Sequence, residues 1–300
     1  MPDIYTFYNE IPLWLSELLP KEIHAKHVNN DIENLEKHIT NKSILICSNK
    51  EEEFVSCCER KQLEYGIISI SDEANKNFMG YATSELCKFI VRGYLHPHLI
   101  KVLRRFGMTN KSLHLHPGYT NKFFREAKNT NIIDFPQYTW SFAGEMKPGR
   151  VKALEAFKRL EGGKMVLTDQ GFKPDKQKTS GLISENYFKL LQNSLFVPCP
   201  LGWVNIDTQR FYETLEAGAI PVVLKNGSPE DSETSYWKTK FQTIQALPFV
   251  EAHSWDEAVE ECDYIIKTGQ ALHARRECHS FWFSLKRHWQ KSLRHLIINF

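Results

Sequence analysis

The stretch Ser194–Leu224, SLFVPCPLGWVNIDTQRFYETLEAGAIPVVL, gives the strongest indication of the fold. The apolar run 195–200 predicts a buried strand, residues 208–218 have helical spacing and end on a glycine, and a second apolar run follows at 219–225. A strand, a glycine-containing loop, a helix and another strand in this order form one β-α-β unit. The loop and the start of the helix follow the first strand at its carboxyl end, where open α/β sheets bind ligands.

The same alternation of strands and helices occurs on the amino-terminal side of this stretch. Residues 43–71 indicate strand, helix and strand, and residues 139–168 indicate strand, Pro-Gly turn, helix and strand. We further expect a helix at Ser84–Val91, a strand within 112–119, and a helix at 184–194 with Ser184 as its N-cap. The first forty residues match no pattern. With 300 residues, the chain predicts two α/β domains, each with a doubly wound sheet.

Composition and charge narrow the range of functions. The chain is 42% hydrophobic and 25% charged, which is typical of a globular protein. Its 38 basic and 36 acidic residues leave a net charge of +2, so we expect no nucleic acid partner. Seven cysteines without a C-x-x-C pair favour reduced thiols, and the first 20 residues lack the features of a signal peptide. We therefore expect a cytoplasmic location.

The helix within the first stretch carries an arginine and a glutamate on one face. Free backbone N–H groups at its start, near Asp207 or Thr208, would attract a diphosphate. Arg210 and Glu213 are three residues apart, so the arginine can reach phosphate oxygens while the carboxylate accepts ribose hydroxyls. The alternative is an ordinary ion pair on a solvated helix face, which contributes roughly 0.2–0.5 kcal/mol.

This part of the chain resembles the signature of the exostosin-like glycosyltransferases: an aromatic-Pro-Gly loop, then Ser/Thr-x-Arg-x-x-Glu, then small-Gly-x-Ile-Pro-Val. The matching residues are Pro200, Gly202, Trp203, Thr208, Arg210, Glu213, Gly218, Ile220, Pro221 and Val222. Four further segments follow the order seen in that family, which includes ribitol xylosyltransferases: SISDE at 69–73, VRGY at 91–94, LHPGY at 115–119 and WSFAGEMKPGR at 140–150. The resemblance covers roughly residues 66–225.

The resemblance implies a GT-B fold, in which two Rossmann-like domains face each other across a cleft. It implies an acceptor domain at 1–137, a nucleotide-sugar-binding domain at 138–278, and an amphipathic helix at 279–300 that crosses back to the first domain. Two departures stand out: Gln209 replaces the proline that commonly precedes the arginine, and we expect no counterpart of the membrane anchor of the animal members. Without such an anchor, we expect a bacterial or viral cytosolic enzyme.

The resemblance also assigns the donor-binding residues, which are Gly144, Arg150, Pro200, Gly202, Thr208, Gln209, Arg210 and Glu213. Arg150 begins the helix after the Pro-Gly turn and is expected to neutralise the second phosphate of the leaving nucleotide, a role that a metal would otherwise fill. Its alternative is a solvated arginine at a helix start. UDP is the nucleotide that the resemblance favours, and no cofactor beyond the nucleotide sugar is expected.

An inverting transfer needs a base that takes the proton of the acceptor hydroxyl. Asp72 and Glu73 directly follow the strand 66–71, so they lie at its carboxyl end, and we expect one of them to be the base. Asp72 is alternatively a helix cap. Arg92 and Tyr94 are expected on the acceptor side or as packing residues.

The sequence has two further features, its histidine pairs and its carboxyl-terminal segment. The pairs His96/His98 and His114/His116 have metal-ligand spacing, but no acidic or cysteine cluster completes a site, so we expect no metal. Residues 278–300 form a basic amphipathic helix, which either packs on the protein or contacts an anionic membrane that carries a lipid-linked acceptor.

These observations predict a metal-independent, inverting glycosyltransferase that moves a sugar from a UDP-sugar to a glycan or lipid-linked saccharide. The alternatives are a GT-B transferase that uses a CMP- or GDP-sugar, or a Rossmann-like binding protein that has lost catalysis. A dehydrogenase is disfavoured because no G-x-G-x-x-G follows a predicted strand.

Overall fold

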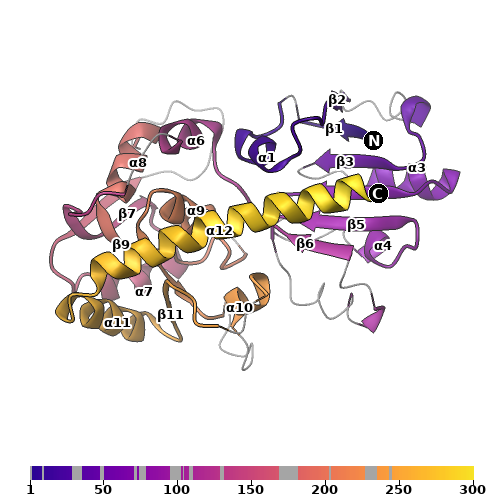
Figure 1. Ribbon diagram of the computed structural model, residues 1–300. Coiled ribbons are helices and arrows are strands. Elements are labelled where there is room, and N and C mark those ends of the chain that lie inside the picture. The colour runs from indigo at the N-terminus through magenta and orange to yellow at the C-terminus, as the bar shows by residue number, and fades with distance from the viewer. Residues whose placement is uncertain are drawn as a thin grey trace. The chain divides into compact units, whose positions relative to one another are not determined.

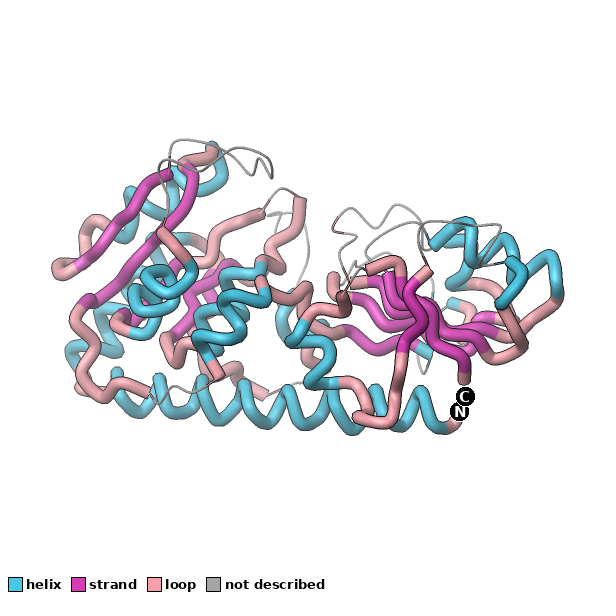
Figure 2. Tube along the Cα trace, turned by 90° about the horizontal axis from the view of Figure 1, so that it is seen from above, coloured by secondary structure: helices cyan, strands magenta, loops and turns pink. Residues whose placement is uncertain are grey.

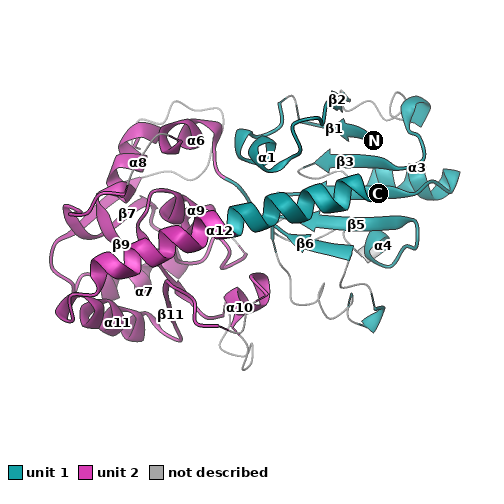
Figure 3. Cartoon of the chain, viewed as in Figure 1, with its two compact units in different colours: residues 1–118, 285–300 teal, residues 119–284 magenta. Residues whose placement is uncertain are grey.

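The computed structural model contains two compact units, residues 1–118 with 285–300 (unit 1) and residues 119–284 (unit 2), which Figure 3 colours separately. Each unit is built on one parallel β-sheet with helices (Figure 1). The residues that the structure describes are 2–8, 10–28, 36–47, 51–70, 73, 79–94, 103, 105–107, 111–128, 132–168, 182–202, 204–226, 235–242 and 245–300.

Unit 1 contains a six-stranded parallel sheet in the order β2-β1-β3-β4-β5-β6. Its strands are β1 (Asp3–Thr6), β2 (Ala25–His27), β3 (Ser43–Cys47), β4 (Tyr65–Ser69), β5 (Cys87–Arg92) and β6 (Ser112–His114). Helices α1 (Leu13–Leu18), α3 (Glu51–Lys61) and α4 (Met79–Ala82) lie between them along the chain. Every residue of β3 and of β4 is buried, which is the pattern of a parallel sheet that is covered on both faces.

Most expected elements of unit 1 are confirmed, and one is wrong. The β-α-β unit within 43–71 is β3, α3 and β4. The helix expected at Ser84–Val91 is instead the strand β5, in which Ile90 and Val91 pair with β4 and are fully buried. A short apolar run of this kind fits a buried strand as well as a helix, and pairing with the neighbouring strand decides between them.

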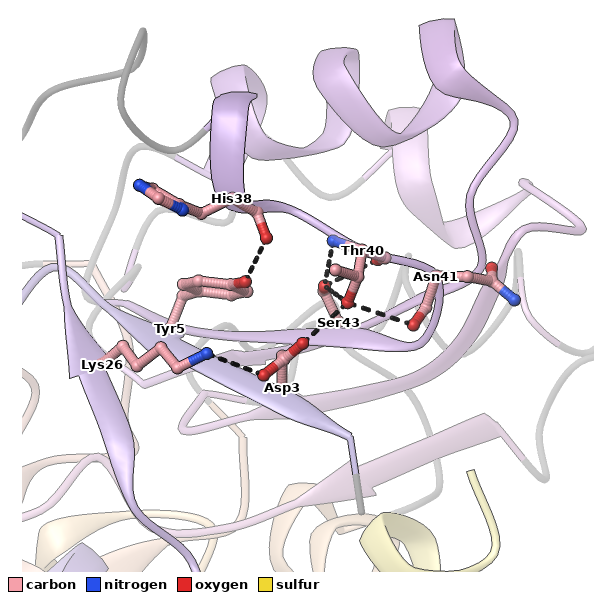
Figure 4. A network of polar contacts seen from close by, with 7 residues as sticks. All are labelled: Asp3, Tyr5, Lys26, His38, Thr40, Asn41 and Ser43. Carbon is pink, nitrogen blue, oxygen red and sulfur yellow. Dashed lines mark hydrogen bonds and ion pairs between the residues drawn. The ribbon is translucent and has the colours of Figure 1, made fainter.

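The strands β2 and β1 form one edge of this sheet. Figure 4 shows the polar contacts of β1. Tyr5 donates a hydrogen bond to the backbone oxygen of His38 (2.6 Å). Asp3 accepts a hydrogen bond from the hydroxyl of Thr40 (2.8 Å) and forms an ion pair with Lys26 (2.9 Å). These bonds connect β1 and β2 to the segment that leads into β3. The sequence showed no periodic pattern around these two strands.

Unit 2 contains a five-stranded parallel sheet in the order β11-β10-β9-β7-β8. Its strands are β7 (Tyr138–Glu145), β8 (Gly163–Thr168), β9 (Ser194–Pro198), β10 (Ile220–Leu224) and β11 (Val250–Ala252). Its helices are α6 (Asn121–Ala127), α7 (Pro148–Phe157), α8 (Ser184–Gln192), α9 (Gln209–Glu216), α10 (Tyr236–Lys240) and α11 (Trp255–Lys267). The strands and helices expected between 139 and 225 are all present.

Two helix ends in unit 2 bear on the expectations from the sequence. Gly218 follows α9 with φ +75°, a left-handed conformation that glycine adopts without strain, and this confirms the predicted helix end. Ser184 was expected to be the N-cap of α8 but is its first helical residue, and Ile183 holds the cap position without a side-chain hydrogen bond. That prediction was wrong by one residue.

The last helix, α12 (Ala271–Ile298), runs unbroken for 28 residues (Figure 2). Its residues are shared between the two units, as the colours of Figure 3 show. In unit 2, Arg275 donates hydrogen bonds to the backbone oxygens of Gly218 (2.8 Å) and Gln192 (3.0 Å). In unit 1, the ring of Trp289 stacks on His116 at 5.4 Å, and Leu293 is fully buried. No helix among the described residues is long and apolar enough to cross a membrane.

Candidate functional site

The order of the strands in unit 2 marks the place where a ligand would bind. From β7 the chain continues to β8 on one side, and later strands, β9 and β10, lie on the other side. The carboxyl ends of β7 and β9 therefore border a topological switch point, the usual ligand site of a doubly wound sheet. Gly144 and Glu145 end β7 there, and the loop 199–208 leaves β9 at the same edge.

Two arginines meet at this switch point. Arg150 at the start of α7 donates a hydrogen bond to the backbone oxygen of Glu145 (2.8 Å), and Arg210 at the start of α9 donates one to that of Ala143 (2.7 Å). Both guanidinium groups also lie over the ring of Phe142, at 5.9 Å and 4.3 Å from its centroid. The end of β7 thus holds two cations side by side.

The electrostatics of this arginine pair favour an anion. Burial, and after it the charge of Arg210, lower the pKa of Arg150 to about 10. The Nε atoms of both arginines are buried and find no hydrogen-bond partner among the described residues. Two like charges with unused donors form a site that a diphosphate would complete with charge-assisted hydrogen bonds.

Gly144 leaves the space that the arginines occupy. It has φ +151°, and a Cβ at this position would lie 2.8 Å from Nη2 of Arg210 and 3.5 Å from Nη1 of Arg150. A side chain at this position would push against the guanidinium group of Arg210 and would lie in ordinary contact with that of Arg150. Gly144 therefore leaves room for the guanidinium group of Arg210, and its role in donor binding stays a prediction.

The start of α9 presents further polar groups. Thr208 occupies the N-cap position without a side-chain cap, and its buried Oγ1 has no hydrogen-bond partner among the described residues. Gln209 is the first, exposed residue of the helix. Since free N–H groups and the positive end of the helix dipole are at this end, the start of α9 adds to the attraction for an anion.

Glu213 lies one turn further along α9. Its side chain is 9% exposed and accepts a hydrogen bond from the hydroxyl of Tyr187 on α8, at 2.8 Å. Burial raises the pKa of Glu213, and the bond from Tyr187 and the charge of Arg210 oppose part of that shift. The solvated ion pair between Arg210 and Glu213, the alternative raised by the sequence, is not formed, because each residue binds another partner.

A buried ion pair fixes the loop between β9 and α9. The carboxylate of Asp207 accepts hydrogen bonds from Tyr212 (2.7 Å) and Tyr236 (2.9 Å) and pairs with the buried amine of Lys240 on α10. Nearer to β9, the backbone N–H of Gly202 donates to Asn205 (3.0 Å). Pro200, at the start of this loop, is buried, and Trp203 lies outside the described residues.

The structure describes three of the four catalytic and acceptor-side candidates in unit 1. Asp72 lies outside the described residues, and Glu73 follows β4 with a half-buried side chain. Arg92 is 1% exposed, donates a hydrogen bond to the hydroxyl of Tyr81, and lies 3.9 Å from the carboxylate of Glu51. Tyr94 is half-buried, and the catalytic and acceptor roles of these residues stay predictions.

The histidine pairs show no metal geometry in the part of the chain that the structure describes. His114 and His116 are buried, and His96 and His98 lie outside the described residues. No group of three or more histidine, cysteine or acidic side chains is arranged for a metal among the residues described. All seven cysteines are buried free thiols.

Three features of the site were not predicted from the sequence. These are the ring of Phe142 beneath the arginines, the bond from Tyr187 to Glu213, and the Asp207–Lys240 pair. Phe142 stands two residues before the glycine on the same strand, so the alternation of the strand could have identified it. The other two join residues 26 and 33 positions apart, and no local pattern indicates them.

Comparisons with solved structures agree with the two-unit architecture. The structure of Anabaena Alr3699/HepE in complex with UDP-glucose matches with a TM-score of 0.55 at 7% identity, over 98% of this chain and 99% of that protein. The GtfA/B complex matches with a TM-score of 0.54 at 9% identity, over 89% of this chain but only 59% of that protein. At these identities the likeness shows the fold, which is GT-B as expected.

The pneumococcal O-GlcNAc transferase GtfA in complex with UDP and GlcNAc gives a TM-score of 0.50 at 10% identity, over 88% of this chain and 58% of that protein. Among curated proteins no sequence matches the chain. The family model of the RXYLT1 C-terminal domain matches residues 122–299, which is more than half of the chain and includes the whole arginine site. The chain therefore belongs to the RXYLT1 C-terminal domain family, and the resemblance to exostosin-like glycosyltransferases is confirmed.

Proposed function

We propose that this protein transfers a sugar from a UDP-sugar to a saccharide or glycolipid acceptor. The observation that carries the proposal is the arginine pair at the switch point of unit 2, where Arg150 and Arg210 keep unused donors beside Gly144. In this proposal the two guanidinium groups bind the diphosphate and stabilise the leaving nucleotide as the glycosidic bond to it breaks. Glu213, on the same face of α9 as Arg210, accepts hydrogen bonds from the ribose hydroxyls.

UDP is supported as the nucleotide by the solved structures that share the fold. Alr3699/HepE is described in complex with UDP-glucose, and the pneumococcal GtfA in complex with UDP and GlcNAc. Because the paired arginines supply the positive charge that a divalent cation supplies in other transferases, the proposed reaction is independent of metal. Turnover that is unchanged by a chelator would support this part of the proposal, and loss of turnover would contradict it.

The proposed reaction inverts the anomeric centre. A carboxylate of Asp72 or Glu73 takes the proton from the acceptor hydroxyl as its oxygen attacks the sugar. Single Asp72→Asn and Glu73→Gln variants identify the base: we expect one of them to lower kcat by at least about a hundredfold while UDP binding stays normal. Normal turnover in both variants would show that neither carboxylate is the base.

The donor class is tested by calorimetry with UDP, GDP, CMP, dTDP and NAD. We expect the wild type to bind UDP and the Arg210→Ala variant to lose that binding, while Arg294→Ala, an exposed arginine on α12, serves as the matched control. Binding of GDP or CMP in place of UDP would show that the donor is a GDP-sugar or a CMP-sugar. Binding of none would overturn it, and UDP binding without any turnover would favour a binding protein.

We further propose that the exposed basic residues of α12 contact an anionic membrane surface, without insertion of the helix into the bilayer. Leu285, Trp289 and Leu293 on the apolar stripe of α12 are buried, so this stripe is not available for insertion into a bilayer. Arg287 and Arg294 remain exposed, in a segment from 278 to 300 without an acidic residue. Such residues each contribute about 1 kcal/mol at an anionic surface.

Cosedimentation with vesicles tests this contact. We expect binding to phosphatidylcholine vesicles that contain phosphatidylserine, no binding to phosphatidylcholine alone, and loss of binding in an Arg287→Glu, Arg294→Glu double variant or at high salt. Equal sedimentation of wild type and double variant would contradict the contact.

A further inference from the structure

Tyr187 and Glu213 join two helices at the proposed donor site. Tyr187 projects from the first turn of α8, and its hydroxyl donates to Oε2 of Glu213 on α9 at 2.8 Å. Glu213 has no second hydrogen-bond donor among the described side chains and backbone groups, although its side chain is only 9% exposed. One carboxylate oxygen is therefore occupied by the protein, and the other keeps its capacity to accept.

The aromatic ring of Tyr187 is fixed by packing. It lies 5.9 Å from the ring of Phe123, which is 1% exposed on α6 and also packs edge-on against Phe188 at 5.5 Å. The N-cap Thr120 accepts a hydrogen bond from the backbone N–H of Phe123 and so fixes the start of α6. The hydroxyl of Tyr187 is thus delivered to the carboxylate from a rigid neighbour rather than from a mobile side chain.

The bond has a defined polarity. Burial and the negative charge of Glu213 raise the pKa of Tyr187 well above its ordinary value, so the phenol keeps its proton and acts as the donor. A carboxylate with one oxygen held in this way is restricted to one orientation. Its remaining lone pairs then keep a fixed direction, which is the condition for selective hydrogen bonding.

We propose that Tyr187 is a positioning residue that orients Glu213 toward the ribose hydroxyls, and that the pair makes the donor site selective for ribonucleotides over deoxyribonucleotides. The inference rests on the proposed function, because it assumes that a nucleoside diphosphate binds beside α9. It goes further in naming the residue that sets this selectivity. Tyr187 itself does not contact the reacting atoms in this scheme.

The test compares the affinities of UDP and 2′,3′-dideoxy-UDP for wild type, Tyr187→Phe and Tyr264→Phe, measured by calorimetry. Tyr264 is 61% exposed on α11 and is the matched control for loss of a tyrosine hydroxyl. We expect wild type and control to prefer UDP by at least about tenfold, the value of a hydrogen bond to a charged group. For Tyr187→Phe we expect the affinity for UDP to fall by about tenfold and the affinity for the dideoxy compound to change little.

The outcomes separate the inference from the function on which it rests. If Tyr187→Phe lowers the affinities for both nucleotides equally, or lowers neither, Tyr187 is only a packing residue and the inference is overturned. If wild type binds both nucleotides equally, the ribose is not recognised through Glu213, although the donor class stands. If wild type binds no UDP, the proposed function fails first and the inference with it. Thermal unfolding of Tyr187→Phe, which keeps the ring against Phe123, confirms that the variant is folded.

Discussion

Gly144 and Arg210 occupy adjoining space at the end of β7, where a Cβ on the glycine would lie 2.8 Å from Nη2 of the arginine. A Gly144→Ala substitution must therefore displace the guanidinium group, and it also places an alanine at φ +151°. We expect UDP affinity to fall by about tenfold or more, and the free energy of unfolding to fall by about 1 kcal/mol. Calorimetry and urea unfolding measure the two effects.

Gly149→Ala is the matched control for this substitution. Gly149 lies in the first turn of α7, and a Cβ there would be 3.8 Å from Leu201, an ordinary contact distance. We expect its UDP affinity to equal that of wild type. If Gly144→Ala bound UDP as well as Gly149→Ala does, the crowding between residue 144 and the arginine would have no functional meaning.

The arginine pair is expected to lower stability in the absence of a ligand. Arg150 is partly buried next to another cation, and its pKa is lowered to about 10, so the unliganded protein bears a repulsion that a bound anion would remove. We expect Arg150→Met to melt at a temperature equal to or above that of wild type, and to lose the stabilisation that UDP gives. Thermal unfolding with and without UDP measures both.

Lys152→Met controls for the loss of a cation from α7, because Lys152 is exposed on the same helix. It should keep the full UDP-dependent shift. A marked drop in the melting temperature of unliganded Arg150→Met would show instead that the bond from Arg150 to Glu145 outweighs the repulsion, and that the pair is structural.

The sheet of unit 2 and its arginine site could largely be predicted from the sequence because both follow local patterns. The apolar runs became β7, β9 and β10, and the three-residue spacing put Arg210 and Glu213 on one helix. The switch point required only the strand order that such alternation produces. The family motif then indicated that Arg150, the one arginine of α7, would join the site.

Other features could not be predicted because they depend on contacts distant in the sequence. The segment that became β5 was expected to be a helix, since only pairing of Ile90 and Val91 with β4 makes it a strand. Tyr187 gave no signal, because its role depends on how α8 packs against α9. Lys240 lies 33 residues from Asp207, and its short helix shows no periodic pattern.

The buried pair of Asp207 and Lys240 is expected to be needed for stability. Burial raises the pKa of the carboxyl and lowers that of the amine, so each ion depends on the other to remain charged inside the protein. Lys240→Met would leave an uncompensated buried carboxylate, and we expect a loss of about 3–5 kcal/mol in the free energy of unfolding. Urea unfolding at neutral pH measures the loss.

Two further variants show whether the charge is responsible. Lys238→Met changes a half-buried lysine of the same helix and should leave stability within about 0.5 kcal/mol of wild type. Adding Asp207→Asn to Lys240→Met removes the unpaired carboxylate and should recover most of the loss. If the double variant were less stable than Lys240→Met alone, the hydrogen bonds of Asp207 to its tyrosines would be the larger contribution.

Glu213 is expected to make the stability of the unliganded protein depend on pH. Because burial raises its pKa above the ordinary 4.5, the folded state holds a proton at pH values where the unfolded chain has lost it. The carboxyl therefore favours the folded state fully below about 4.5, and this contribution is lost as the pH rises through the folded pKa. Glu213→Gln, which can still accept from Tyr187, should be more stable than wild type at pH 7, with the difference shrinking toward pH 4.5. Thermal unfolding of both proteins across this pH range checks the trend. If Glu213→Gln instead lost stability relative to wild type as the pH rises from 4.5 to 7, the hydrogen bond from Tyr187 and the charge of Arg210 would stabilise the carboxylate by more than burial destabilises it.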